Sequence, residues 1–287
     1  MVGTRRALAS LSGMRTLALA VASCLAAACS ITTAEPQLLV QPYLAVYQLR
    51  GDIAMQSNLV AIGGFAFAQD NPANDLRTFG QDHYREDFGI RADFGDGFGG
   101  LRVDYYKLDQ KSAGNGSLAN DFGELPATDI VTMDVEMDEL RIGYLEPLFH
   151  VKSKLRDKPL DVQFALGAVL AHREMDLRAR SLVSAREQKT EIEGDVGYAA
   201  ARFRIGWHDF AIDADYAISP DLALGGDFEG TLQDLELRAS YTVPYREITF
   251  FGGWRYSTLP AEGHARFFRY DADLVLDGFQ LGVMVTF

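Results

Sequence analysis

The chain ends with the stretch FQLGVMVTF, residues 279–287, in which every second side chain is apolar up to the last residue. Successive side chains of a β-strand point to opposite faces, so this spacing predicts a strand with one continuous apolar face. The residues of that face are Phe279, Leu281, Val283, Val285 and Phe287. Because a soluble protein rarely ends in this way, the stretch predicts a strand that faces an apolar environment.

This terminal strand resembles the closing strand of bacterial outer-membrane β-barrels, which ends on an aromatic residue of an apolar face. In those proteins the last residues are recognised by the barrel-assembly machinery. The resemblance therefore implies that this machinery is a partner of the chain. It also implies that the assembly signal consists of Phe279, Leu281, Val283, Val285 and Phe287. The resemblance is confined to this strand and identifies no specific family.

The first 34 residues have the layout of a secretory signal peptide. Arginines, an apolar run and small residues follow one another there without a single acidic residue. This order predicts cleavage after Ala34 and export through the inner membrane, leaving residues 35–287 as one barrel domain. An uncleaved helical anchor and lipidation at Cys24 or Cys29 stay open as alternatives. Since both cysteines lie in this segment, a cleaved chain could form no disulfide and no cysteine-based metal site.

The charge balance argues against a nucleic-acid partner. The chain holds 27 basic and 40 acidic residues, and its formal net charge is −13. Beyond residue 34 no apolar run is long enough for a spanning helix. A closed β-barrel can still cross a membrane, because closure gives every backbone donor and acceptor a partner.

Alternation of apolar and polar residues recurs along the rest of the chain in segments of transmembrane-strand length. Residues 88–94, 210–218 and 235–243 are clear examples. We therefore predict an all-β, transmembrane, antiparallel up-and-down β-barrel of about 10 strands, with 8 to 12 left open. Residues 51–82 make the count uncertain, because they could form a short helix or plug inside the barrel, or an extra hairpin.

The face opposite the apolar one carries charges of both signs among glycine and alanine, which favours a narrow lumen over the water-facing surface of a soluble sandwich. These residues are Arg91, Asp93, Arg102, Asp104, Arg141, Arg202, Arg204, Asp213, Asp215, Glu236, Arg238 and Arg255. On this assignment Leu237→Arg, on the lipid face, should cost ~2–4 kcal/mol, and Glu236→Gln much less.

In three segments, residues 137–142, 232–237 and 276–281, the apolar alternation changes phase. We interpret each change as a β-bulge between a lipid-facing part and an external part of the strand. A tight turn at Asp277-Gly278 is the alternative for the last segment.

The connections between strands are predicted from charged and turn-forming residues. We expect a solvated acidic loop over residues 109–134, a basic turn over 150–158, a charged loop over 173–189 and a last loop around 260–263. The acidic loop could alternatively bind Ca²⁺ or bridge cations of lipopolysaccharide, although its spacing fits no metal-binding loop.

Known barrel enzymes of the outer membrane show which groups of residues catalysis in such a barrel would require. The chain is similar to the omptin proteases in size and strand number, and their acid pairs and Asp/His couple would correspond to Asp213, Asp215, Asp82 and His83. We predict instead that the two aspartates pair with lumen arginines. For the Ser/His pair of barrel lipid hydrolases, the externally placed histidines His172 and His264 lack a motif. We therefore predict no catalytic residue, no cofactor site and no metal site.

The sequence predicts a non-enzymatic outer-membrane barrel of a Gram-negative bacterium, acting as a membrane scaffold or in surface interactions, with a largely occluded lumen. Its partners would be outer-membrane lipid, lipopolysaccharide and the assembly machinery; the oligomeric state stays open. The alternatives are a narrow channel for small solutes and an enzyme acting on lipid or peptide at the external rim.

Overall fold

A computed structural model describes residues 37–56, 60–62, 65–67, 71–220, 223–244, 246, 248–265 and 268–287. The predicted signal peptide lies outside the described residues. Within the described ranges, no helix has the length and apolar character needed to cross a membrane.

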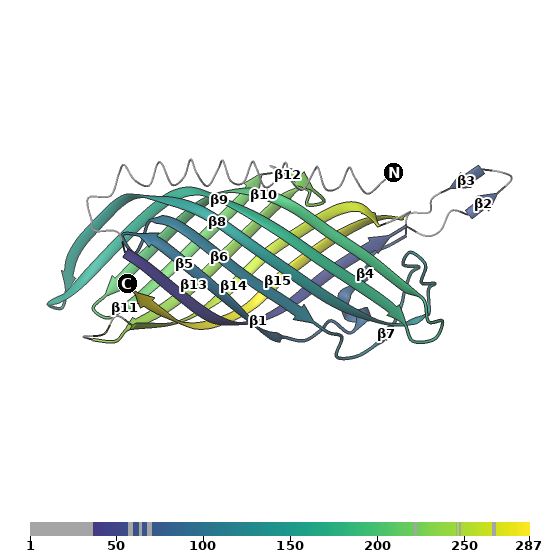
Figure 1. Cartoon of the computed structure of the whole chain (residues 1–287), viewed down its shortest axis with the longest axis horizontal. Helices are drawn as coiled ribbons and strands as arrows, with labels where there is room; N and C mark the ends of the chain where they lie inside the picture. The colour runs from purple at the N-terminus through teal and green to yellow at the C-terminus, as the bar shows by residue number, and fades with distance from the viewer. Residues whose placement is uncertain are drawn as a thin grey trace.

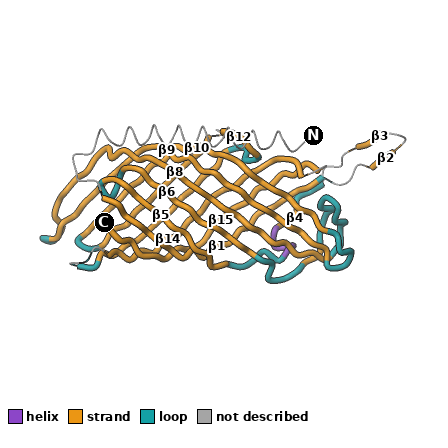
Figure 2. Tube along the Cα trace, viewed as in Figure 1, coloured by secondary structure: helices purple, strands orange, loops and turns teal. Residues whose placement is uncertain are grey.

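Ten antiparallel strands form a closed ring in the described part of the chain. Figures 1 and 2 show these strands running obliquely along the length of the barrel. Each long strand pairs with the next long strand along the chain, and β15 pairs back to β1. They are β1 (Gln37–Met55), β5 (Arg85–Gly95), β6 (Gly100–Gln110), β8 (Ile130–Leu155), β9 (Lys158–Ser181), β10 (Glu187–Trp207), β11 (Phe210–Pro220), β13 (Thr231–Thr242), β14 (Ile248–Ala265) and β15 (Phe268–Thr286). The predicted up-and-down barrel of about 10 strands is confirmed.

The terminal stretch closes the ring. Leu39 of β1 lies opposite Thr286 of β15, and the Leu38 amide donates to the Phe287 carbonyl oxygen at 3.3 Å. The first described strand therefore begins, and the last one ends, at the same end of the barrel (Figure 1). We call this the C-terminal end and the opposite one the loop end.

A belt of exposed apolar side chains surrounds the half of the barrel nearer the C-terminal end. Phe88 is 78% exposed and Leu281 is 60% exposed. The belt includes Phe88, Ile90, Phe94, Tyr105, Phe203, Ile205, Phe210, Ile212, Tyr216, Leu237, Tyr241, Phe250, Phe279 and Leu281. Transmembrane barrels turn such a band toward lipid, and the exposure of Leu237 beside the buried Glu236 agrees with the predicted face assignment.

Toward the loop end the apolar side chains move from the outward to the inward face of the strands, and the polar side chains move the opposite way, without any bulge. On β8 the outward side chains change from Asp134 and Glu136 to Leu140 and Ile142, while the inward side chains change from apolar to charged. The pairing register of β8 with β6 and β9 is unbroken through this change, as is that of β13 and β15 with their neighbours. The predicted bulges, and the turn at Asp277-Gly278, are therefore wrong. The wall leaves the apolar surroundings at this level, so its apolar face turns inward to form a core.

Several predicted loops are strand. The β9–β10 connection is confined to residues 182–186, and β14 continues to Ala265 through Pro260. The predicted basic turn is a continuation of β8 and β9, joined by a two-residue turn at Arg156 and Asp157. Charged residues were mistaken for loop because they face outward on strands whose inner face is apolar.

The loop end is covered by the segments that made the strand count uncertain. The small strands β4 (Asn74–Asp75) and β7 (Gly116–Ser117) pair with β1 and β8, and the 3₁₀ helix η1 (Leu76–Phe79) buries Leu76 and Phe79. The loop over residues 111–129 buries Leu118, Phe122 and Leu125, so the prediction that it is a solvated loop is wrong. Residues 51–82 contain two of the predicted alternatives, a plug at this mouth and a separate hairpin of β2 (Val60–Ile62) and β3 (Phe65–Phe67). The short strand β12 (Ala223–Gly226) pairs with β10.

Candidate functional site

The lumen at the level of the belt is the candidate functional site, and a network of buried ion pairs fills it. Arg91 of β5 lies between two carboxylates. It donates to Asp104 of the neighbouring β6 at 2.9 Å and to both oxygens of Glu236 on β13 at 2.8 and 2.9 Å. Because β5 and β13 are not neighbours in the ring, the Arg91–Glu236 pair crosses the lumen.

A second cluster centres on Glu139 of β8 and lies next to the apolar core. Glu139 accepts from Arg141, Arg173 and Arg255, the last at 2.7 Å. Arg255 also donates to Asp234 at 3.0 Å, and Arg141 donates to Asp234 at 2.7 Å. The side chains of Glu139 and Arg173 are both 0% exposed. Three arginines thus share two carboxylates in the absence of bulk water, and each bond supports the others.

A third cluster forms where β10, β11 and β13 lie side by side. Asp213 accepts from Arg204 at 2.5 Å and from Arg238 at 3.3 Å. Asp215 pairs with Arg202 at 2.6 Å and, across the lumen, with Arg102 at 3.0 Å. Asp213 and Asp215 therefore pair with lumen arginines, as predicted, and they are not presented at an external rim.

The free space left in the lumen is small. A cavity of about 60 Å³ lies among the clusters of the described residues, with room for only a few water molecules. Its charged lining comes from Arg91, Arg102, Arg141, Arg202, Asp104, Asp215, Asp234 and Glu236. Aromatic rings also occupy the cross-section of the lumen at this level. The guanidinium of Arg255 lies 4.8 Å from the ring centre of Tyr106, and that of Arg238 lies 5.4 Å from the ring centre of Phe251.

Above the charged layer the described interior is mainly apolar up to the covered mouth, with a few buried polar side chains such as Gln110 among the apolar ones. Leu49, Ile53, Met137, Val135 and Leu274 are all fully buried there. The interior consequently has two layers. The charged layer lies at the level of the belt, and the mainly apolar layer lies in the part of the barrel between the belt and the loop end, which we call the outer extension. Side chains of both layers are buried inside the ring of strands.

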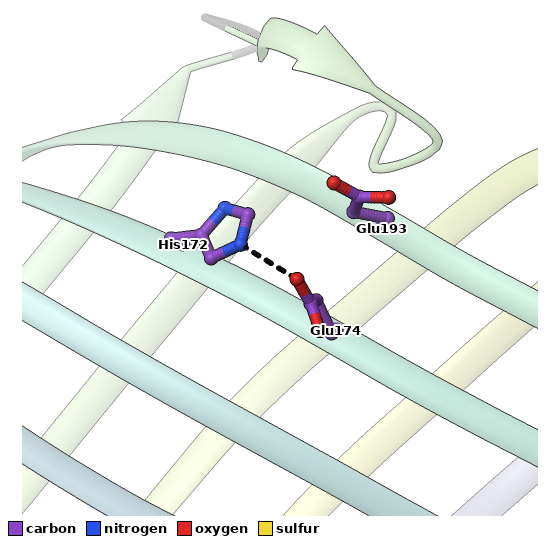
Figure 3. Close-up of side chains that lie close together, drawn as sticks. All are labelled: His172, Glu174 and Glu193. Carbon is purple, nitrogen blue, oxygen red and sulfur yellow. Dashed lines mark hydrogen bonds and ion pairs between the residues drawn. The ribbon is translucent and has the colours of Figure 1, made fainter. Parts of the chain in front are cut away.

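A smaller cluster lies on the outer wall just above the belt. His172, Glu174 and Glu193 each bring one potential ligand atom within 4.8 Å of the others (Figure 3). Both ring nitrogens of His172 already have carboxylate partners, Nδ1 with Asp195 at 2.9 Å and Nε2 with Glu174 at 3.1 Å. Burial lowers the pKa of His172, but the bonds to Asp195 and Glu174 outweigh it and raise the pKa above the ordinary histidine value. The geometry is that of an ion-paired imidazolium.

The titration of His172 tests this reading. A raised pKa in the folded state stabilises the fold at pH values below the unfolded pKa, and this contribution is lost as the pH rises through the folded pKa. We expect the imidazole signal of His172 in NMR to titrate above the ordinary histidine range, and Asp195→Asn to lower its pKa. A titration at or below the ordinary value in the unsubstituted chain would contradict the ion-paired geometry.

The other histidines considered for catalysis are not brought together. His172 lies on β9 and His264 on β14, and the ring places three strands between these two. His83 precedes β5, and its Nδ1 lies 3.9 Å from the carboxylate of Asp82. The described residues thus bring no second acid pair to Asp82 and His83.

The sequence interpretation missed part of the network. It placed Arg173 in an external charged loop, whereas Arg173 is a fully buried partner of Glu139. Strict alternation contains the missing signal, because Arg173 lies an even number of residues from the inward-facing Ala171, Met175 and Leu177. Asp234 is similarly in phase with Glu236 and Arg238 on β13.

The residues of the predicted assembly signal lie at the end of the chain, on the outer face of the barrel. Phe279 and Leu281 are exposed on the outer face of β15, Val283 and Val285 follow on the same face, and Phe287, directly after the strand, is also exposed. Its function as a signal stays a prediction. Deleting Phe287 should reduce the amount of assembled barrel in the membrane fraction and leave chain in the periplasm, whereas Thr286→Ser on the same strand should not. Cell fractionation measures this, and normal assembly without Phe287 would count against the signal.

No protein-family model and no curated protein matches the sequence. Solved structures resemble the fold. The outer membrane protease OmpT from Escherichia coli is 10% identical with a TM-score of 0.47, over 89% of this chain and 99% of that chain. Neisserial surface protein A is 11% identical (TM-score 0.33; 87% and 97%), and the translocator domain of the autotransporter NalP from Neisseria meningitidis is 12% identical (TM-score 0.35; 98% and 97%). At these values the likeness carries no function from them to this chain.

Proposed function

We propose that this chain is an integral outer-membrane β-barrel whose lumen is closed to solutes, and that it acts as a membrane scaffold presenting its outer extension. The observation that carries the proposal is the buried ion-pair network at the level of the belt, in which Arg91, Arg173 and Arg255 bridge different strands. An open channel would keep water around such charges, whereas a scaffold benefits from a lumen that braces the wall.

The membrane placement is supported by the sharp upper edge of the belt. On β9 the outward side chains change from Leu170 to His172, and on β15 from Phe279 to Asp277. Asp277 pairs with Arg50 of β1 at 2.9 Å on the outside of the wall. Below this level an outward charge would lie in lipid, and above it an outward apolar residue would lie in water, so one plane separates the two environments.

Conductance in planar bilayers tests the closed lumen. The folded chain, identified by its changed gel mobility without boiling, should produce no stepwise current. An open porin reconstituted in the same bilayer should conduct and shows that the assay detects an open lumen. Steady single-channel steps from the unsubstituted chain would favour the narrow channel and contradict the proposal.

We also propose that the barrel is not an enzyme. Support comes from the separation of His172 and His264 and from the pairing of Asp213 and Asp215 with arginines. If the folded protein cleaves peptide or lipid substrates, and His83→Ala, His172→Ala or His264→Ala abolishes that cleavage with unchanged gel mobility, the rim-enzyme alternative replaces this proposal.

A further inference from the structure

The hairpin of β8 and β9 continues past the ends of its neighbours at the C-terminal end of the barrel (Figure 1). β6 pairs with β8 only as far as Leu145, and β10 pairs with β9 only as far as Leu160. Residues 148–159, which we call the ribbon, therefore extend as two strands joined by the turn at Arg156 and Asp157. A two-stranded ribbon is marginally stable in water on its own, so its surroundings should support it.

One face of the ribbon is apolar and continuous with the belt. A register shift between Pro147 and Phe149 brings Phe149 opposite Phe164, with the two rings stacked at 5.5 Å. Val151 follows opposite Val162 on the same face, and Leu155 ends it. Val151 is 54% exposed and Leu155 is 51% exposed. This face prolongs the outward surface of Phe164 beyond the end of the other strands, where water would otherwise meet it.

The belt's aromatic edge reaches this face. Trp207, the last residue of β10, lies opposite Leu160 and donates from Nε1 to the Leu155 carbonyl oxygen at 3.4 Å. Tryptophan at this level is typical of the boundary between acyl chains and head groups. The ribbon is thus joined to the lipid-facing surface by a side chain suited to the interface.

The other face and the tip are basic, in contrast to the net charge of −13 for the whole chain. Four exposed cations are concentrated here: Lys152, Lys154, Arg156 and Lys158. Within the described ranges none of them has a carboxylate partner within salt-bridge distance, since Asp161 pairs with His150 instead. Their charge is consequently available to an anion outside the chain.

We propose that the ribbon lies in the periplasmic leaflet of the outer membrane and binds anionic phospholipid there. Its apolar face inserts among acyl chains beside Trp207, and its lysines extend to the phosphates, as long basic side chains do at interfaces. This inference rests on the proposed function, because the belt must first be in the membrane.

Single cysteines can locate the ribbon, in the full chain with Cys24 and Cys29 replaced by alanine. An environment-sensitive fluorophore is placed at Val151 on the ribbon, at Phe279 on the belt and at Val183 in the β9–β10 connection. In phosphatidylcholine vesicles containing phosphatidylglycerol, we expect brominated acyl chains to quench the probes at positions 151 and 279. Aqueous iodide should quench only the probe at position 183.

The lipid charge is tested with a matched pair of variants. Lys152→Gln with Lys154→Gln should lower the phosphatidylglycerol affinity reported by the position-151 probe on the order of tenfold. The control, Lys107→Gln with Arg180→Gln, removes the same charge from the outer extension and should leave that affinity unchanged. Equal effects of the two pairs would overturn anionic-lipid recognition by the ribbon.

The probe at Phe279 on the belt distinguishes a failure of the membrane placement from a failure of the ribbon inference. If the probe at Phe279 is not quenched by brominated lipid, the membrane placement itself fails. If it is quenched while the Val151 probe is quenched by iodide, the barrel stands and the ribbon inference is overturned. The unpaired edge of β8 beyond Leu145 would then be the place to look for a protein strand.

Discussion

Glu139→Gln is expected to destabilise the folded barrel by ~3–5 kcal/mol, because it removes the carboxylate charge shared by three buried arginines. Glutamine keeps the size of the side chain, so the loss reflects charge and not a cavity. Arg173, whose side chain is 0% exposed, would keep no carboxylate partner. Urea unfolding of the protein in detergent micelles, followed by tryptophan fluorescence, measures the change in free energy.

The preceding residue on the same strand provides the control. Asp138 faces outward, and its pair with Lys107 is solvent-exposed at 3.6 Å. Asp138→Asn removes the same charge and should cost about 0–1 kcal/mol. Similar costs for the two substitutions would mean that the Glu139 cluster is hydrated in the folded protein, and the closed lumen would lose its main support.

Glu236→Gln is expected to cost ~3–5 kcal/mol, at least as much as the ~2–4 kcal/mol expected for Leu237→Arg. This reverses the order expected from the sequence alone. Glu236 is buried and holds Arg91 through two bonds at 2.8 and 2.9 Å, so its neutralisation leaves a buried guanidinium with fewer partners.

Gln233→Arg controls for the arginine substitution. Gln233 lies on the same outward face as Leu237 but above the belt, where the added charge is in water and should be nearly neutral. Vesicle-based unfolding of the three variants gives the comparison. A cost for Glu236→Gln well below that of Leu237→Arg would restore the sequence expectation and argue that Arg91 is hydrated.

The lipid-facing half of the barrel could be predicted from local patterns. Alternation in the terminal stretch and around Leu237 correctly identified the outward residues, because a strand's neighbours in sequence decide which side chains share a face. The change of environment along a strand could not be recognised in this way. The phase change at residues 137–142 is the same in the sequence for a bulge as for a straight strand leaving the membrane. Only the unbroken register of β8 separates the two.

The sequence by itself determined a chain of alternating strands, with charged residues on the face away from lipid. The tertiary structure decided which of those charges meet. Arg91 reaches Glu236 145 residues away, and Arg255 reaches Glu139 116 residues away. Such pairs depend on ring closure and on the stagger of the strands, which set the height of each inward residue relative to distant strands. Local periodicity carries no information about that height, so the ion pairs across the lumen emerge only when the ring is complete.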